Sequence, residues 1–359
     1  MEDQGRWPVA APWVREAVAG RPRHLFAPSR LWDWNGETYV PVDRGSAPDG
    51  WAALVYAGPA ASAVTQITDG LPSSSLSCPA IVADMLDSLM PEPGHRVLEL
   101  GTGTGWNAAL LEHRTGPGTV TSVEYDPQLA AAARERLEDV GSSADVQVGD
   151  GSEGRPAGAP YDRVESTYAV EEVPWSWVEQ TRPGGRIVAP WGRMGHVALT
   201  VADDGRSATG WMQGLATFMP ARGTGQGLSL HQVRTGTPID SEEPLTYDPR
   251  PLHADMNLLF ALRVQLADVR VHTEAADAGT TVWLHDGRSS RATLLAPAQG
   301  PGTVYQGGPR RLADELGHAW RRWEKRGSPG LYDFGMTVTP GSTRVWSGDE
   351  PRTAQTWLT

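Results

Sequence analysis

Arg96-Val97-Leu98-Glu99-Leu100-Gly101-Thr102-Gly103-Thr104-Gly105-Trp106-Asn107 is the stretch that decides the fold. Its first half is a short apolar run, which is typical of a strand buried on both faces. Three glycines at every second position follow, and Ala108-Ala109-Leu110-Leu111 then supplies good helix formers. Strand, glycine turn and helix form the opening of a nucleotide-binding βαβ unit, in which the glycines let the backbone pass close to a ligand.

The spacing of the glycines argues against a dinucleotide ligand. In the G-x-G-x-x-G fingerprint the third glycine packs the helix onto the strand, and here that position holds Trp106. The observed G-x-G-x-G, preceded by Glu99, resembles the first motif of S-adenosylmethionine-dependent methyltransferases. S-adenosylmethionine has no pyrophosphate but carries a cationic sulfonium and an amino group, so nearby carboxylates are useful. Taken alone, the glycines could also form a bare structural turn.

Two later acidic residues favour the cofactor. The predicted strand 120–126 contains Glu124, about twenty residues past the turn, where a carboxylate can accept both ribose hydroxyls. A third predicted strand, 146–148, leads to Asp150, which in such enzymes faces the adenine amino group. Either acid alone could be a solvated loop end, but three in order after successive strands indicate S-adenosyl-L-methionine. The predicted cofactor-binding residues are Glu99, Gly101, Thr102, Gly103, Thr104, Gly105, Glu124, Tyr125, Gly149, Asp150, Gly151 and Thr167.

Composition limits the other possibilities. The 359 residues include 31 basic and 43 acidic side chains, a net charge of −12, which argues against nucleic acid as a partner. No run of about eighteen apolar residues exists, so no membrane span is expected. The polar N-terminus is unlike a secretory signal, and the single cysteine, Cys78, suits a reducing cytoplasm. Because the nine histidines are scattered, no metal site is expected.

The alternation of strands and helices predicts an α/β fold with a doubly wound, Rossmann-like parallel sheet and the site at the carboxyl ends of its strands. We predict three parts: an N-terminal helical and irregular segment with a substrate loop, 1–94; an S-adenosylmethionine-binding core, 95–222; and a C-terminal α+β accessory domain, 228–359. A flexible joint is expected at 223–227. Strands are expected at 53–56 and 216–219, and a serine-rich loop at 71–79.

Several local motifs together resemble the protein-L-isoaspartate O-methyltransferase family over roughly residues 15–222. They are the glycine turn, the Glu124 strand, Gly149-Asp150-Gly151, Pro183-Gly184-Gly185, Ala216-Thr217-Phe218-Met219-Pro220 and Pro22-Arg23-His24-Leu25-Phe26. The most specific is Ser75-Leu76-Ser77-Cys78-Pro79, which is similar to the family's threonine-isoleucine-serine-x-proline loop. The resemblance implies that Ser77 lies beside the methyl-accepting carboxylate. We also expect Ser75 and Tyr168 to contact substrate, although Tyr168 could instead only pack against its neighbours.

The sequence also departs from the family pattern. Tyr168 stands in a stretch that is usually small and alanine-rich, and the run Ser73-Ser74-Ser75 and the long C-terminal region are foreign to the housekeeping repair enzyme. These features resemble a branch encoded with ribosomally made, modified peptides such as lanthipeptides, lasso peptides and ATP-grasp-ligated peptides. That resemblance implies methylation of an aspartate in a constrained peptide, after which the ester collapses to an aspartimide.

Methyl transfer to a carboxylate needs little acid–base catalysis, because a carboxyl group with a pKa of about 4 is already ionised at neutral pH. A hydroxyl such as that of Ser77 suits this chemistry by donating a hydrogen bond that places the carboxylate. Two alternatives remain open for this segment: Ser77 is only a helix cap before Pro79, and Cys78 is a reactive thiol instead of a small buried hydrophobe.

Three functions therefore compete. The first is a carboxyl O-methyltransferase that forms aspartimide in a partner peptide, and the second is general repair of isoaspartyl residues in proteins. The third is a non-catalytic protein that binds a precursor peptide, although the retained Glu99, Gly101, Glu124 and Asp150 count against it. Nucleic-acid methylation is disfavoured because Ser166-Thr167-Tyr168 lacks an Asn/Asp-Pro-Pro-aromatic base clamp. The expected partner is a peptide or protein that carries aspartate or isoaspartate.

Overall fold

The computed structural model describes residues 1, 5, 7–192, 194–223, 227–348 and 355–358. The chain divides into two compact units. The first comprises Met1–Arg222 and Met336–Thr343, and the second comprises Gly223–Gly335 and Arg344–Thr359. Part of the predicted joint, residues 224–226, lies outside the described residues.

The first unit is built on a mixed sheet whose strand order is β17-β11-β10-β9-β8-β5-β6-β7. The strands are β5 (Val97–Leu100), β6 (Val120–Glu124), β7 (Asp145–Val148), β8 (Tyr161–Ser166), β9 (Thr181–Trp191), β10 (Gly195–Val201), β11 (Ala208–Leu215) and β17 (Phe334–Thr339). From β7 to β9 neighbouring strands are parallel, whereas β10 runs antiparallel to both β9 and β11. The predicted α/β fold is confirmed, but its sheet is only partly parallel.

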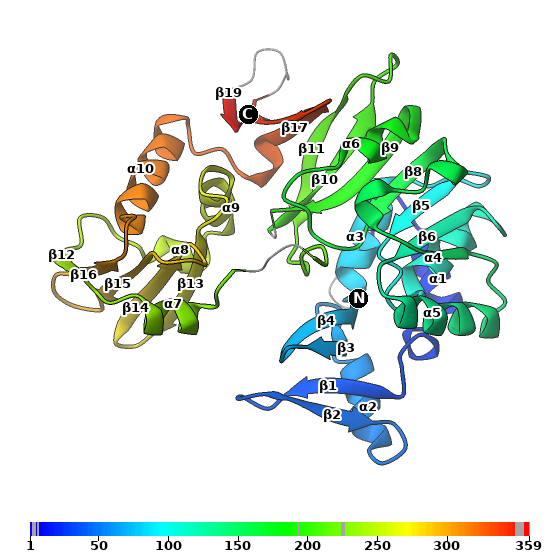
Figure 1. Ribbon diagram of the computed structural model, residues 1–359, viewed down its shortest axis with the longest axis horizontal. Helices are drawn as coiled ribbons and strands as arrows, with labels where there is room; N and C mark the ends of the chain where they lie inside the picture. Colours follow the sequence, from blue (N-terminus) through cyan, green and yellow to red (C-terminus); the bar gives the residue numbers. More distant parts are fainter. Residues whose placement is uncertain (2–4, 6, 193, 224–226, 349–354, 359) are drawn as a thin grey trace. The chain divides into compact units, whose positions relative to one another are not determined.

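Helices cover this sheet and share its core (Figure 1). One continuous cluster of buried residues joins α1 (Trp13–Gly20), α3 (Pro79–Leu89), α4 (Trp106–Thr115) and α5 (Pro127–Asp139) to β5 and β6. The short helix α6 (Trp175–Glu179) packs against β9. Because β5 is buried along its whole length, the turn that follows it rests on a rigid base.

A smaller antiparallel sheet precedes the main one, with strand order β2-β1-β3-β4. It contains β1 (Arg30–Trp34), β2 (Tyr39–Asp43), β3 (Ala63–Thr68) and β4 (Leu71–Leu76), with α2 (Pro48–Val55) between β2 and β3. The serine-rich segment expected to be a loop is therefore largely strand β4, because it pairs along β3 in a hairpin. This strand leads directly to Ser77 and α3.

Two other expected strands in the first unit are wrong. Residues 53–56 end helix α2, which begins with Pro48 in its first turn, a position that suits proline. Residues 216–219 are irregular, and the strand is instead the preceding β11. Gly210 concealed β11 in the sequence, since glycine usually interrupts a strand. Here a Cβ at this position would overlap the Ala198 carbonyl oxygen of β10, so the close strand approach requires glycine.

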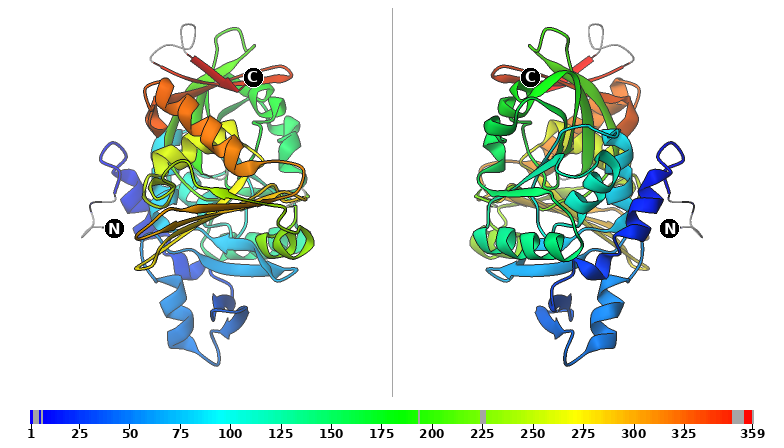
Figure 2. Two further views of the ribbon diagram at one scale, coloured as in Figure 1. Left: turned by 90° about the vertical axis from the view of Figure 1, so that its left-hand side faces the viewer. Right: turned by 90° about the vertical axis from the view of Figure 1, so that its right-hand side faces the viewer.

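The second unit contains a five-stranded antiparallel sheet with strand order β12-β16-β15-β14-β13. Helix α10 (Leu312–Lys325) lies across one face of this sheet (Figure 2). The strands are β12 (Ser241–Pro244), β13 (Arg270–Ala276), β14 (Gly279–His285), β15 (Arg291–Pro297) and β16 (Thr303–Gly307). The remaining elements are α7 (Leu230–Gly236), α8 (Pro251–Ala254), α9 (Met256–Gln265), β18 (Ser342–Ser347) and β19 (Gln355–Leu358).

Within the described residues, no helix has the length and apolar character needed to cross a membrane. The same residues contain no cluster of three or more His, Cys, Asp or Glu side chains arranged to hold a metal ion.

Candidate active site

The turn after β5 depends on its glycines. Gly101, Gly103 and Gly105 have φ angles of 96°, 53° and 88°, a left-handed region that side chains disfavour. A Cβ on Gly101 would overlap the hydroxyl of Thr167, which donates to the Gly101 carbonyl at 2.5 Å. By contrast, a Cβ on Gly103 would find no atom closer than Ser74 Oγ, at 3.9 Å. The turn is therefore tightly supported at Gly101 and has space beside Gly103.

Glu124, at the end of β6, holds the turn from the neighbouring strand. Its Oε2 accepts a hydrogen bond from the Gly103 N–H at 2.9 Å, and its Oε1 accepts one from the Asp126 N–H at 3.1 Å. Each carboxylate oxygen has two acceptor sites, so each keeps one for a further donor. Two vicinal hydroxyls are a ligand group that such a carboxylate can bind.

Several other predicted cofactor residues lie in the loops next to Glu124. Tyr125 is 55% exposed and directly follows Glu124. Asp150 follows β7, the neighbour of β6, and its exposed carboxylate accepts a hydrogen bond from the Ser152 N–H. Thr102 and Thr104 are buried within the turn, where the Thr102 hydroxyl bonds to Ser122. Gly149 donates its N–H to the Glu124 carbonyl, so it orders the loop before Asp150.

Tyr168 lies among these predicted cofactor residues. A Cβ on Gly151 would overlap the Tyr168 hydroxyl, and a Cβ on Gly101 would lie 3.0 Å from its ring. Burial raises the pKa of this phenol, and the carboxylates of Asp150 and Glu124 raise it further. The ring thus spans the space between two loops predicted to hold the cofactor. This placement differs from the predicted role of Tyr168 in the substrate pocket.

Glu99 does not reach the open side of the turn, which corrects its predicted role in cofactor contact. Its side chain is fully buried, and its two oxygens accept hydrogen bonds from Ser122 and from Asn107 Nδ2. The same Asn107 nitrogen donates to Glu165, which faces Glu99 on the adjacent strand β8. Burial raises the pKa of Glu99 to about 8 and that of Glu165 to about 7. These carboxyl groups anchor the first turn of α4 beneath the site.

Ser77 lies between β4 and α3 and is not the helix cap that its sequence context allowed. The N-cap residue is Cys78, and it makes no side-chain capping bond. In the described part of the chain, the Ser77 hydroxyl has no hydrogen-bond partner. Nearby in sequence, the Ser75 carbonyl oxygen would lie 4.0 Å from a Cβ on Gly103. The strand that leads to Ser77 therefore approaches the glycine turn, while the Ser77 hydroxyl stays available.

The sequence did not reveal how Ser77 is held. The buried guanidinium of Arg23 donates to the carbonyl oxygens of Leu76 and Ser77, both at 2.9 Å, and also to the Val55 carbonyl. It lies over the ring of Trp106, 5.5 Å from the centroid. Trp106 is buried against this segment, and its indole N–H donates a hydrogen bond to the Arg21 carbonyl oxygen.

The sequence also did not predict a second arginine that holds this region. The Arg222 guanidinium contacts Asp126 Oδ2 at 3.1 Å, Gln66 Oε1 at 2.6 Å and the Ser73 carbonyl at 2.9 Å. It therefore joins the β3–β4 hairpin to the start of α5, just after Glu124. Arg23 and Arg222 both contact residues that are far away in the sequence, so local sequence motifs could not predict these contacts.

The residues present fit S-adenosyl-L-methionine. Glu124 offers two acceptor positions where the ribose would lie, Gly103 leaves space for the ligand, and Asp150 offers an exposed acceptor near Tyr125. Strand β4, which leads to Ser77, approaches the same turn beside Gly103.

Comparison with known proteins supports this conclusion. Residues 47–221 match the sequence family described as protein-L-isoaspartate(D-aspartate) O-methyltransferase. The chain is 36% identical over 208 residues to the protein-L-isoaspartate O-methyltransferase of Aeropyrum pernix, covering 55% of this chain and 68% of that protein. The chain belongs to the protein-L-isoaspartate O-methyltransferase family. The cofactor of this family of carboxyl methyltransferases is S-adenosyl-L-methionine.

Other relatives agree. Protein-L-isoaspartate O-methyltransferase 2 of Archaeoglobus fulgidus is 33% identical over 213 residues, which cover 58% of this chain and 85% of that one. A solved structure titled protein-L-isoaspartate O-methyltransferase aligns with 95% of this chain and 96% of its own, with a TM-score of 0.50 and 20% identity. Because that alignment includes most of the C-terminal region, this region is not foreign to the fold of proteins so titled, contrary to our expectation.

The assignment of Glu124 predicts a specific loss of cofactor affinity. Glu124→Gln removes the charge and one acceptor, so S-adenosyl-L-methionine should bind about 1.5–3 kcal/mol more weakly, the range for hydrogen bonds to a charged group. Isothermal titration calorimetry would measure this change. Glu99→Gln is the matched control and should leave the affinity nearly unchanged, because Glu99 is buried beneath the turn. Equal affinities for wild type and Glu124→Gln would contradict the assignment.

The buried Glu99 predicts how stability depends on pH. Its folded pKa of about 8 lies above the unfolded value of 4.5, so between these values the folded state binds more protons than the unfolded state. The free energy of unfolding should therefore fall as the pH rises from about 5 to about 8. Glu99→Gln mimics the protonated acid, so the decrease in the free energy of unfolding over this pH range should be smaller in the variant, by about 2–4 kcal/mol. Urea unfolding at several pH values tests this, and parallel pH profiles for both proteins would exclude it.

Proposed function

We propose that this chain transfers the methyl group of S-adenosyl-L-methionine to an aspartyl or isoaspartyl carboxylate of a polypeptide. The observation that carries this proposal is the Ser77 hydroxyl, which has no hydrogen-bond partner in the described part of the chain although Arg23 holds its backbone firmly. A fixed backbone with a free hydroxyl is suited to donate a hydrogen bond to an incoming carboxylate. Its loop also approaches the glycine turn, where the methyl donor is expected.

In this reaction the main task of the protein is to orient the acceptor carboxylate relative to the methyl donor. The acceptor carboxylate is ionised at neutral pH and is the nucleophile, so no general base is required. S-adenosyl-L-methionine, when bound, supplies a methyl group on a sulfonium that leaves as a neutral thioether. Ser77 places the carboxylate, and Glu124 and Asp150 position the donor. Alignment of this kind can supply roughly 7–11 kcal/mol of the reduction in barrier.

The three parts of the chain receive separate roles in this proposal. Residues 1–94 carry the acceptor loop with Ser75 and Ser77, and residues 95–222 hold the cofactor. We assign residues 228–359 to peptide binding, as an accessory part that contributes no catalytic side chain. We move Tyr168 from the acceptor pocket to the cofactor side, because its ring lies between Gly101 and Gly151.

Two acceptors remain in competition. The named activity of the relatives favours isoaspartyl residues in damaged proteins, and therefore a repair function. The second candidate is aspartate in a ribosomally made, constrained peptide, whose ester would close to an aspartimide. The serine-rich strand β4 supports it, because this strand leads directly to Ser77, the residue that we assign to the acceptor. The C-terminal region no longer argues for either candidate.

Ser77→Ala should lower kcat about 10- to 100-fold, corresponding to the loss of one hydrogen bond to a charged group. Binding of S-adenosyl-L-methionine and the melting temperature should stay close to those of the wild type, since Ser77 does not cap α3. Cys78→Ala is the matched control at the adjacent position and should retain activity. A Ser77→Ala enzyme with full kcat would remove Ser77 from the acceptor site, and an inactive Cys78→Ala enzyme would revive the reactive-thiol alternative.

The two acceptors give different products. In an aspartyl ester the next backbone nitrogen can attack the ester carbonyl, expel methanol and close the five-membered imide. A constrained peptide that shields this imide should accumulate a species lighter than the starting peptide by one water, after a transient ester heavier by one methylene unit. Mass spectrometry of a linear isoaspartyl peptide and a cyclised aspartyl peptide, with equal enzyme, distinguishes them. Turnover of the linear peptide alone supports repair, and turnover of the cyclised peptide alone supports aspartimide formation.

A further inference from the structure

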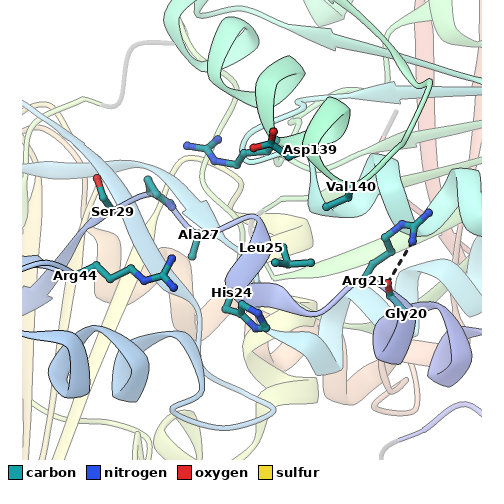
Figure 3. Close-up of a pocket in the computed structure, with 11 residues that line it drawn as sticks. Gly20, Arg21, His24, Leu25, Ala27, Ser29, Arg44, Asp139 and Val140 are labelled. Carbon is teal, nitrogen blue, oxygen red and sulfur yellow. Dashed lines mark hydrogen bonds between the residues drawn. The ribbon is translucent and has the colours of Figure 1, made fainter.

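A cavity of about 670 Å³ lies in the first unit, away from the residues assigned above (Figure 3). One wall is the segment 20–29, which follows α1, and the other is the end of α5 with Asp139 and Val140. Arg44, just after β2, also lines it. Neither the predicted cofactor residues nor the Ser77 loop contributes to this lining.

The lining is rich in positively charged side chains. Arg21, Arg44 and Arg136 come from three separate segments, whereas Asp139 is the one carboxylate in the lining. Among the described residues no ion pair joins these three arginines to a carboxylate. Arg21 Nε is buried without a hydrogen-bond partner. Because the chain as a whole carries a net charge of −12, this local excess of cations is suited to attract an anionic ligand.

The shape favours an extended ligand over a single ion. In Figure 3, Arg44 and Arg21 lie toward opposite ends of the cavity, with His24 and Leu25 between them. The wall is also linked to the acceptor loop, because Arg23 in the same segment donates to the Ser77 carbonyl. A guanidinium binds a carboxylate through paired hydrogen bonds, so carboxylates spaced along a peptide match this lining.

We propose that this cavity binds an acidic segment of a polypeptide, whose carboxylates contact Arg44, Arg136 and Arg21. As a site for the flank of a methyl-accepting peptide, it rests on the proposed function. The cationic lining would offset the repulsion that an acidic segment meets from the negative net charge. It would give acidic polypeptides an advantage over neutral ones that carry the same acceptor.

Binding can be tested without turnover. The probe is a fluorescein-labelled hexaglutamate, which has no aspartate to accept a methyl group, and hexaglutamine is its neutral counterpart. Fluorescence anisotropy with the full chain should show binding of hexaglutamate and not of hexaglutamine. Arg44→Gln should weaken this binding at least about fivefold, and Arg44→Lys should retain most of it. Arg206→Gln makes the same charge change at an exposed position in the β10–β11 turn, outside the cavity lining, and should have little effect.

Several outcomes would overturn the proposal. Equal losses in Arg44→Gln and Arg206→Gln would mean that only net charge matters. If inorganic phosphate, added at the same concentration of negative charge, displaces the hexaglutamate, the cavity binds simple anions and not an acidic peptide segment. In activity assays, isoaspartyl peptides flanked by glutamates or by glutamines should differ in kcat/KM in the wild type but not in Arg44→Gln. Specific binding of hexaglutamate without methylation of any peptide would contradict the proposed function and leave the acidic-segment site supported.

Discussion

The hydrogen bond from the Gly103 N–H to Glu124 is the interaction on which the site depends. It fixes the turn after β5 to the end of β6, at a residue, Gly103, that adopts a left-handed conformation. The same carboxylate accepts from the Asp126 N–H, and Asp126 in turn caps α5. One side chain thus orders two loops and still has acceptor sites for a ligand. A carboxylate already held in this way loses little conformational entropy when a cofactor binds.

Two arginines, Arg23 and Arg222, explain how the irregular segment at Ser77 can carry the proposed acceptor site. Ser77 follows an edge strand of a small sheet, which would normally be mobile. Arg23 donates a hydrogen bond to the Ser77 carbonyl oxygen, and Arg222 donates one to the Ser73 carbonyl oxygen in the hairpin that leads to Ser77. Both guanidinium groups act on backbone carbonyls, so the Ser77 hydroxyl is not consumed in holding its own loop. The structure thus positions this loop through Arg23 and Arg222 and leaves the Ser77 hydroxyl available for the role that we propose.

The sequence predicted the features that are local and failed on those that are long-range. Strand β5, the glycine turn, Glu124 at the end of β6 and Asp150 after β7 follow from the spacing within two successive βαβ units, each about thirty residues long. The burial of Glu99 depends on Asn107 and on Glu165 of strand β8, which become neighbours only in the folded sheet. The contacts of Tyr168 with Gly101 and Gly151 are long-range in the same sense. Family resemblance indicated Ser77, but only the fold shows that Arg23 and Arg222 hold its loop.

The buried carboxyl pair clarifies the electrostatics of the site. Glu99 lies directly beneath a turn that is expected to bind a cationic sulfonium, and an ionised Glu99 would attract that charge. Burial raises the pKa of Glu99 and therefore disfavours its charged form, which reduces the negative charge beneath the turn while its oxygens bind Asn107 and Ser122. The carboxylates available to bind the cofactor are therefore those at the strand ends, Glu124 and the exposed Asp150. Recognition of the donor would then rest on the hydrogen-bond acceptors that Glu124 and Asp150 offer.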